Sequence, residues 1–430
     1  MKKRLLSALC AVMLLICAVP MASAQTGDAA RRADALTVLH LLSEDPGRDL
    51  TAPATRAQAA VLLVRLAGGE KKPDTDGWFA GFRDVPDWAR TAANYANRRG
   101  WISGVSNVQF DPNGHLNADA WCAMLLRMLG YSDKTGDFEI SDAAAFAWRI
   151  GLTGRQLIGI LSVGDLAESI YDALDFCYKG TETTVLSRLM DLGVCTASAA
   201  NALGLLNKDY TARQLADRYL SAAFQLSLYE TEEQVHDEVS SADASGFFIS
   251  ADGLAVTNYH SIEDSIKATA TLLNGETYEV ERVLYYDTGI DIAVIKVSRT
   301  NQSRRTTSAF NHLCLVGTAD IRPGDPVYAI GNPLGLGLAI SSGIIGSTAH
   351  ELDRYALPCI VNSADISRGS SGGALMNAHG QVIGVTSGAY TYGNNMYLAV
   401  PVDPVMAADL TVSGWTLKEV KAIEAAKDKD

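Results

Sequence analysis

The spacing of apolar residues changes near the middle of this chain. Up to about residue 229, apolar side chains recur at intervals of three and four, which is the period of helices with one buried face. Beyond residue 240 the pattern becomes short apolar runs punctuated by Gly, Asn and Asp, which is typical of strands and turns. We therefore predict a mainly α-helical first half and an all-β second half. The clearest helices are predicted at residues 56–66, 118–129 and 163–177, and the clearest strands at 246–250, 254–258, 268–272, 292–297, 326–330 and 381–386.

The first 24 residues have the pattern of a signal peptide. Basic residues at positions 2–4 precede an apolar run over 5–19, and an Ala-Ser-Ala sequence follows. The run is shorter than the roughly 20 apolar residues that a spanning helix needs. We expect export and cleavage, with no membrane span afterwards; an uncleaved anchor or a lipid on Cys17 is the alternative.

Charge and cysteine content narrow the classes of partner. The formal charge is −13, and loss of the three basic residues of the signal segment would leave −16, so nucleic acid is not an expected partner. The remaining cysteines are widely spaced and lack the CxxC or CxxH spacing of zinc sites, so we predict no disulfide framework and no metal. These cysteines are Cys122, Cys177, Cys195, Cys314 and Cys359.

Two segments of the helical half form an internal repeat, residues 50–69 and 116–131. The second copy follows FRDVPDWA and GWISGV. These motifs resemble the S-layer homology repeat, in which a Phe-x-Asp-Val-Pro entry and a Gly-x-x-x-Gly turn precede a helix that opens with Thr-Arg-Ala-Glu. The resemblance spans residues 33–195, with copies at about 33–70, 80–131 and 138–180. Residues 196–243, which end in an acidic stretch, are predicted to be a helical linker.

The repeats of this family bind anionic polymers of the bacterial cell wall through the arginine of that motif. The resemblance assigns this role to Arg56, in Thr-Arg-Ala-Gln; the corresponding positions of the other copies carry no arginine. A guanidinium recognises a carboxylate or phosphate through two parallel hydrogen bonds. In the alternative interpretation, Arg56 only stabilises its helix and the repeats are a spacer.

The β half contains a candidate nucleophile in RGSSGGAL, residues 368–375. A serine hydroxyl needs a base to remove its proton, and the base needs a carboxylate to orient it. His260 ends the apolar hairpin at 245–260, Asp291 directly precedes the buried strand at 292–297, and Ser371 lies in the glycine-rich loop. Serine and glycine are also ordinary turn residues, and an aspartate before a strand often only ends a turn.

Six motifs in chain order resemble the chymotrypsin-like serine proteases of the Deg/HtrA branch. They are SGFFIS, TNYH, DIAVIK, GNPLG, SSGIIGS and GSSGGAL. The resemblance covers residues 244–412 and implies a double β-barrel that hydrolyses peptide bonds without a metal or cofactor. It makes His260 the general base, Asp291 its orienting partner and Ser371 the nucleophile. It also implies an oxyanion hole formed by the backbone N–H groups of Gly369 and Ser371.

Asp365 departs from the Deg-type pattern. It lies six residues before Ser371, at the floor of the substrate pocket in trypsin-like enzymes, where Deg-type members are usually apolar. If its carboxylate faces the pocket, basic residues are expected before the cleaved bond. If it is bonded within its own loop, small apolar residues such as Val or Ala are expected. No peptide-binding PDZ module is recognised after the protease segment, and residues 413–430 are predicted to be a charged tail.

The sequence therefore predicts a secreted serine endopeptidase that acts on proteins or peptides and is held at the cell wall or cell surface by its repeats. Two other interpretations stay open. The protease fold could be inactive and serve as a wall-associated binding or scaffold protein. The same three residues could also serve an esterase or acyl transferase.

Overall fold

The computed structural model describes residues 28–43, 48–69, 80–181, 183–206, 208–389 and 395–427. The predicted signal peptide lies outside these residues. The chain divides into two compact units, one of residues 1–147 and 156–206 and the other of residues 148–155 and 207–430. No helix in the described ranges is both long and apolar enough to span a bilayer.

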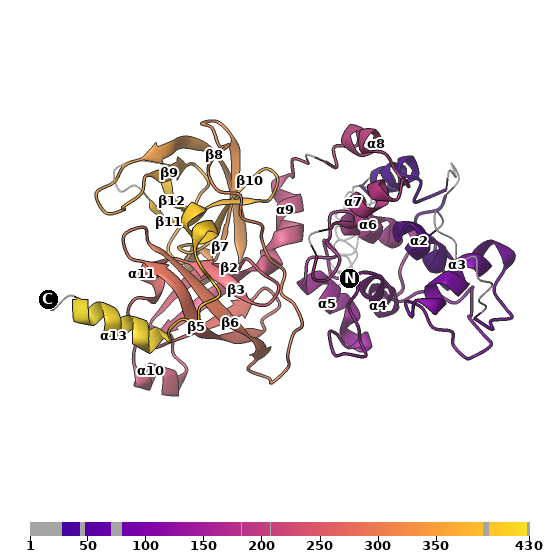
Figure 1. The fold of residues 1–430 in the computed structure, drawn as a ribbon, viewed down its shortest axis with the longest axis horizontal. Coiled ribbons are helices and arrows are strands. Elements are labelled where there is room, and N and C mark those ends of the chain that lie inside the picture. The colour runs from indigo at the N-terminus through magenta and orange to yellow at the C-terminus, as the bar shows by residue number, and fades with distance from the viewer. Residues whose placement is uncertain are drawn as a thin grey trace, which may run out of the picture. The chain divides into compact units, whose positions relative to one another are not determined.

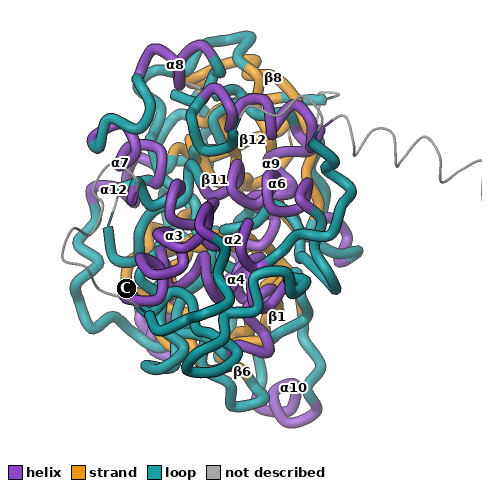
Figure 2. The backbone as a smooth tube through the Cα atoms, turned by 90° about the vertical axis from the view of Figure 1, so that its right-hand side faces the viewer, coloured by secondary structure: helices purple, strands orange, loops and turns teal. Residues whose placement is uncertain are grey.

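The first unit is helical, and Figure 2 shows its short helices joined by loops. Its helices include α2 (Arg56–Leu66), α3 (Asp87–Arg98), α4 (Ala118–Met128), α5 (Ala143–Arg149), α6 (Val163–Ala173), α7 (Val185–Asp191) and α8 (Ala197–Ala202), with a 3₁₀ turn at Ile140–Asp142. The last two residues of α5 belong to the second unit. The three helices predicted from periodicity are confirmed as α2, α4 and α6, although α6 ends four residues before the predicted boundary.

Each of these three helices begins with a capping side chain. Thr55, Asn117 and Ser162 accept a hydrogen bond from a backbone N–H in the first turn of α2, α4 and α6. Such a cap typically contributes about 1 kcal/mol, because the first turn of a helix has no internal acceptor for its N–H groups.

The residues just before the three caps form a closed ring of backbone hydrogen bonds. Leu116 N–H donates to Ala54 O at 3.0 Å, Ala54 N–H donates to Leu161 O at 2.8 Å, and Leu161 N–H donates to Leu116 O at 2.9 Å. Each of the three segments therefore donates one bond and accepts one, so the three helix starts share one pattern of backbone hydrogen bonding.

The second unit contains two closed six-stranded barrels, which Figure 1 shows in red to orange and in orange to yellow. The strand order is β1-β2-β3-β6-β5-β4 in the first and β10-β11-β12-β9-β8-β7 in the second. This arrangement agrees with the predicted all-β double barrel. The strands are β1 (Ala223–Tyr229), β2 (Ala242–Phe248), β3 (Leu254–Thr257), β4 (Lys267–Leu272), β5 (Thr277–Asp287), β6 (Ile292–Asn301), β7 (Pro326–Gly331), β8 (Ala339–His350), β9 (Cys359–Asn362), β10 (Ala374–Asn377), β11 (Val382–Ala389) and β12 (Tyr397–Pro401).

Aromatic rings fill the first barrel. Phe248 stacks on Phe310 with ring centroids 4.2 Å apart, and Phe224 packs against Phe248 at 4.9 Å. A separate apolar cluster joins the two barrels, with Val256 and Val294 on one side and Ile330 and Val385 on the other. Burial of this cluster holds the two barrels together in one arrangement. It therefore determines which side chains of the two barrels lie next to one another at the boundary between them.

The predicted linker at 196–243 is corrected by the structure. Besides α9 (Ala212–Tyr219) and α10 (Glu232–Asp237), it contains β1, which pairs with both β2 and β4 and closes the first barrel. Strand β2 also begins at Ala242, before the predicted start of the protease segment. The seven residues of β1 alternate between the barrel interior and its outside, a period-two pattern that a helical interpretation of the preceding sequence concealed.

The predicted charged tail is corrected as well. Residues Leu417–Lys427 form α13, and Leu417 and Val420 are buried in the core of the first barrel. Ahead of this helix, Trp415 exchanges two backbone hydrogen bonds with Val283 of β5, at 2.7 and 2.8 Å. Two apolar positions three residues apart are enough to dock a helix whose other faces are charged.

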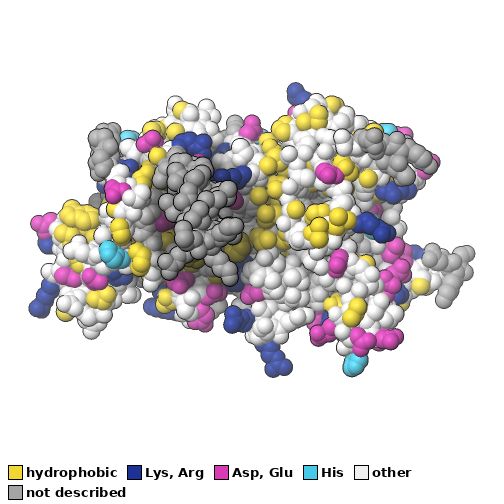
Figure 3. All heavy atoms as spheres, turned by 180° about the vertical axis from the view of Figure 1, so that it is seen from behind, with side chains coloured by type: hydrophobic (Ala, Val, Ile, Leu, Met, Phe, Trp, Pro, Cys, Tyr) yellow, Lys and Arg dark blue, Asp and Glu magenta, His cyan; other side chains and the backbone are white. Residues whose placement is uncertain are grey.

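Charged side chains of both signs share the surface. Figure 3 shows Lys and Arg interspersed with Asp and Glu on one face. No disulfide joins any two of the described cysteines, Cys122, Cys177, Cys195, Cys314 and Cys359. Within the described ranges, no three His, Cys, Asp or Glu side chains are grouped so that they could hold a metal ion.

Candidate active site

His260 lies where the first barrel turns from strand to helix. Strand β3 ends at Thr257, and α11 (Tyr259–Ile262) presents His260 with its side chain 45% exposed. The buried Asn258 anchors this turn, because its side-chain amide donates to Asp291 O at 2.8 Å. The two segments that carry His260 and Asp291 are thus tied together by a neighbouring residue.

Asp291 occupies a left-handed turn directly before β6, with φ of 59°. Aspartate tolerates this conformation better than most residues do. The turn is shaped by Asp287, whose carboxylate accepts the N–H groups of Gly289 and Ile290 at 2.8 and 3.1 Å. Asp291 itself is almost fully buried.

The carboxylate of Asp291 holds both the ring and the backbone of His260. Asp291 Oδ2 and Oδ1 lie 2.8 and 3.0 Å from His260 Nδ1, and Oδ1 also accepts the backbone N–H of His260 at 2.9 Å. Burial raises the pKa of Asp291, but the hydrogen bonds and charge of His260 outweigh burial, so the pKa lies below its ordinary value. An ionised carboxylate at Nδ1 favours the tautomer that leaves Nε2 able to accept a proton.

Two residues that sequence reasoning missed complete the surroundings of Asp291. Ser387 Oγ of β11 donates to Asp291 Oδ2 at 2.6 Å. Since its proton is used there, the hydroxyl of Tyr355, 2.7 Å away, must donate to Ser387 Oγ. Burial raises the pKa of Tyr355, which keeps it a donor at neutral pH. Both residues are distant from Asp291 in sequence, and neither belongs to a motif that would have indicated them.

Ser371 lies in the loop that precedes β10. Its Oγ donates to the backbone carbonyl of Ser387 at 3.2 Å. Within the described part of the chain, no hydrogen bond joins Ser371 Oγ to the ring of His260. The structure therefore brings His260 and Asp291 into direct contact, and brings Ser371 to a residue that itself contacts Asp291. Catalytic hydrogen bonds are often long or misaligned without substrate and tighten only in the complex.

The loop around Ser371 leaves two backbone N–H groups unused. Ser370 N–H donates to Ser367 O at 2.9 Å and Gly372 N–H donates to Thr386 O at 2.8 Å. The N–H groups of Gly369 and Ser371, by contrast, are donors in none of the hydrogen bonds between described residues. Alternate amides of this loop are thus available to an external acceptor, as an oxyanion hole requires.

Gly369 has a conformation that only glycine adopts easily. Its φ is 91°, and a Cβ atom at this position would lie 2.4 Å from Asn332 O. The carbonyl of the preceding residue, Arg368, accepts the N–H of Leu334 at 2.6 Å. Since the C=O and N–H of a trans peptide point in opposite directions, this bond turns the Gly369 N–H away from Leu334. Ser245 holds the following peptide, Gly369–Ser370, because its Oγ donates to Gly369 O at 2.6 Å.

Asp365 lies exposed on the loop before Ser371, and the hydroxyl of Tyr397 donates to its carboxylate. This hydrogen bond raises the pKa of Tyr397. The carboxylate is therefore engaged by a neighbouring strand, β12. The sequence left two arrangements open, a carboxylate that faces the substrate pocket and one that is hydrogen-bonded within its loop. The contact with Tyr397 resembles the second, because the protein itself supplies a hydrogen-bond donor to Asp365.

Arg56, the predicted wall-binding residue, opens α2 in the helical unit. Its Nε and Nη2 donate to Phe110 O and Ser103 O at 2.9 and 2.7 Å, and its guanidinium lies 5.0 Å from the ring centroid of Phe110. Burial lowers the pKa of Arg56. Two of its donors are thus used to join neighbouring segments of the same unit.

Comparison with known proteins identifies the second unit. Residues 244–385 match the trypsin-like peptidase domain family. "Serine protease HTRA1A" of Danio rerio is 31% identical over 219 residues, which cover 50% of this chain and 44% of that protein. "Probable periplasmic serine endoprotease DegP-like" of Halomonas elongata is 35% identical over 177 residues, covering 40% and 35%. "Serine protease HTRA2, mitochondrial" of Bos taurus is 36% identical over 171 residues, covering 39% and 35%.

The chain thus contains a trypsin-like peptidase domain, of the serine endopeptidase class. Its relatives are HtrA/Deg serine proteases, and the resemblance noted in the sequence is confirmed to that extent. The chain spans less than half the length of these curated relatives. The family match does not include the helical unit.

Proposed function

We propose that this protein is a secreted serine endopeptidase that cleaves peptide bonds in protein or peptide substrates through His260, Asp291 and Ser371. The observation that supports this proposal best is the double contact of Asp291 with His260, through both the ring and the backbone, inside a trypsin-like domain. A carboxylate placed in this way orients the base and stabilises its protonated form.

The proposed reaction follows from the positions of these groups. Ser371 Oγ turns from the carbonyl of Ser387 toward His260, whose Nε2 takes its proton as Oγ bonds to the substrate carbonyl carbon. The N–H groups of Gly369 and Ser371 stabilise the negative oxygen that forms. His260 gives the proton to the leaving amine, which leaves an acyl-enzyme, and a water molecule activated by His260 then releases the acid.

The proposal on specificity concerns Asp365. A carboxylate that already accepts a hydrogen bond from Tyr397 has less need of a basic substrate side chain. We therefore favour small apolar residues before the cleaved bond, and a basic residue is the alternative.

The helical unit is proposed to be a set of S-layer homology-like repeats that attach the enzyme to an anionic polymer of the cell wall. Three capped helices joined by a closed ring of hydrogen bonds are what three equivalent repeats would produce. The placement at the cell wall, like secretion, rests on the sequence resemblance and on the signal-like segment.

Arg56→Ala is expected to reduce retention of the protein on purified cell-wall fragments, because it removes the guanidinium that the resemblance assigns to the polymer. Retention is measured by sedimentation, and Arg83→Ala, which changes an exposed arginine of the same unit, is the control. Because Arg56 also bridges Phe110 and Ser103, circular dichroism must show that the variant is folded. Unchanged retention by a folded variant would eliminate Arg56 as a polymer contact.

The catalytic proposal is tested by labelling the purified chain with a fluorophosphonate probe, which reacts covalently with activated serines. We expect Ser371 to be labelled, and labelling to disappear in Ser371→Ala and in His260→Ala. Absence of labelling in the folded wild-type protein would contradict the proposal and favour the scaffold interpretation. Labelling without cleavage of peptide libraries, but with cleavage of esters, would favour an esterase.

A further inference from the structure

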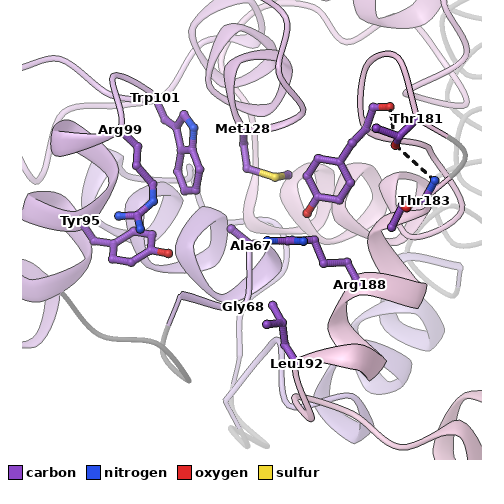
Figure 4. A pocket seen from close by; sticks show the side chains of 11 residues that line it. Ala67, Gly68, Tyr95, Arg99, Trp101, Met128, Thr181, Thr183, Arg188 and Leu192 are labelled. Carbon is purple, nitrogen blue, oxygen red and sulfur yellow. Dashed lines mark hydrogen bonds between the residues drawn. The ribbon is translucent and has the colours of Figure 1, made fainter.

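The helical unit contains a cavity of about 380 Å³ that none of the preceding assignments uses (Figure 4). It lies at the C-terminal ends of α2, α3, α4 and α7. Its lining includes Met128, the last residue of α4, and the residues that directly follow the other three helices, Ala67, Arg99 and Leu192. Arg56 begins α2, so the cavity lies at the opposite end of that helix, about 16 Å away along its axis. It is therefore separate from the predicted polymer contact.

The described lining of the cavity carries positive charge. Its described lining includes two guanidiniums, those of Arg99 and Arg188, and no carboxylate. The Arg188 side chain is exposed, and it makes no hydrogen bond or ion pair with any described residue. Its guanidinium carbon lies 5.7 Å from the ring centroid of Tyr178. A guanidinium stays ionised at any physiological pH and offers five N–H donors, so this one is available to an external anion.

Flat aromatic faces accompany the two arginines. Figure 4 shows Tyr95, Arg99 and Trp101 grouped on one side of the cavity, with Arg188 reaching in from the other. The guanidinium of Arg99 lies 3.6 Å from the ring centroid of Tyr95, and the rings of Tyr95 and Trp101 are 5.8 Å apart. Aromatic faces of this kind pack against the apolar faces of sugar rings or against other flat groups.

Hydrogen-bonding groups other than the arginines also line the cavity. Thr181 Oγ donates to Tyr178 O at 3.0 Å and accepts the N–H of Thr183 at 3.2 Å, so the turn that carries these hydroxyls is already ordered (Figure 4). Helix C-termini expose carbonyl oxygens, which accept hydrogen bonds. A ligand rich in hydroxyls can use donors and acceptors together, whereas a simple inorganic anion uses only the donors.

A purely structural role for the two arginines is the competing explanation. Cations near helix C-termini offset the partial negative charge of the last carbonyls, typically by about 0.3–1 kcal/mol. That role accounts for the positions of Arg99 and Arg188 in or beside last turns. It does not account for a concave site in which both arginines are combined with the partly exposed rings of Trp101 and Tyr178 and with exposed threonine hydroxyls.

We propose that this cavity binds an acidic saccharide unit, with its carboxylate on Arg188 and Arg99 and its ring against Trp101 and Tyr178. The saccharide would be part of the anionic wall polymer to which the helical unit is proposed to attach. Only this biological source of the ligand rests on the proposed function; the binding itself is argued from the residues of the cavity. It is independent of the catalytic proposal, since every residue named belongs to the helical unit.

The test is a ligand-observed NMR titration of the full chain with glucuronate, glucose and inorganic phosphate as probes. We expect glucuronate to bind, and glucose and phosphate to bind at least tenfold more weakly. Glucose lacks the carboxylate that would contact the arginines, and phosphate lacks the ring that would pack against the aromatic side chains. Equal binding of glucose and glucuronate would overturn the proposal. Binding of phosphate alone, or no binding of any probe, would overturn it as well.

Variants locate the binding to this cavity. Arg188→Ala is expected to weaken glucuronate binding about tenfold or more, since a hydrogen bond to a charged group is lost. Arg188→Lys should restore little, because an ammonium cannot make the two parallel bonds of a guanidinium. Arg213→Ala, an exposed arginine of the other unit, is the matched control. Unchanged glucuronate affinity in folded Arg188→Ala would overturn the assignment, whatever the result for retention on cell-wall fragments.

Discussion

Asp291→Asn is expected to lower the rate of peptide hydrolysis about ten-thousandfold and to leave the protein folded. An asparagine amide can donate to His260 Nδ1, which stabilises the tautomer that carries its proton on Nε2. That tautomer cannot accept the proton of Ser371. The rate is measured as kcat/KM on a fluorogenic peptide selected from a library, and folding is checked by thermal denaturation.

Asp287→Asn is the matched control for this variant. Asp287 shapes the same turn through the N–H groups of Gly289 and Ile290, and an asparagine keeps the oxygen that accepts them. It therefore removes one negative charge near the site without changing the partner of His260. If Asp291→Asn retained a rate close to that of Asp287→Asn, Asp291 would be only a turn residue.

Gly369→Ala is expected to lower kcat by about a hundredfold to a thousandfold, with a smaller effect on KM. The added Cβ would lie 2.4 Å from Asn332 O, so the peptide that presents the Gly369 N–H must rotate. Rotation removes one donor to the oxyanion, which is charged only as the reaction proceeds. Steady-state kinetics on the same peptide separate the two constants.

Gly324→Ala separates this effect from general backbone strain. Gly324 has φ of 95°, close to the 91° of Gly369, but its added Cβ would meet no atom within 4 Å. It therefore carries a similar conformational cost without displacing a neighbour, and it lies in a turn that holds no candidate site residue. A similar loss of kcat in both variants would mean that strain, and not a lost donor, explains the effect of Gly369→Ala.

Local sequence patterns predicted those parts of the fold that local patterns determine. The apolar period predicts helix α2 with its observed bounds, and the structure adds a capping box around Thr55 at its start. Strand β1 was missed because its alternation covers only seven residues next to a longer helical pattern. The docked helix α13 was missed because its identity as part of the core depends on two residues, Leu417 and Val420, meeting a surface formed elsewhere in the chain.

The candidate site shows the same limit. Motif order placed His260 and Asp291 together, and the structure has them in contact. Ser387 and Tyr355 were not indicated, because the barrels bring them to Asp291 from strands and loops that follow it by 96 and 64 residues. The spacing of Asp365 from Ser371 gave its place in the loop, but the direction of a side chain on an exposed loop depends on partners such as Tyr397 that spacing does not reveal.

The ring of hydrogen bonds among Ala54, Leu116 and Leu161 has a consequence for how the helical unit gains its stability. In an open array of repeats, each repeat contacts only its neighbours, and an end repeat can unravel while the others persist. A closed ring has no end segment, since removing any one of the three segments breaks two of the three bonds. The helical unit is therefore expected to unfold in a single all-or-none step.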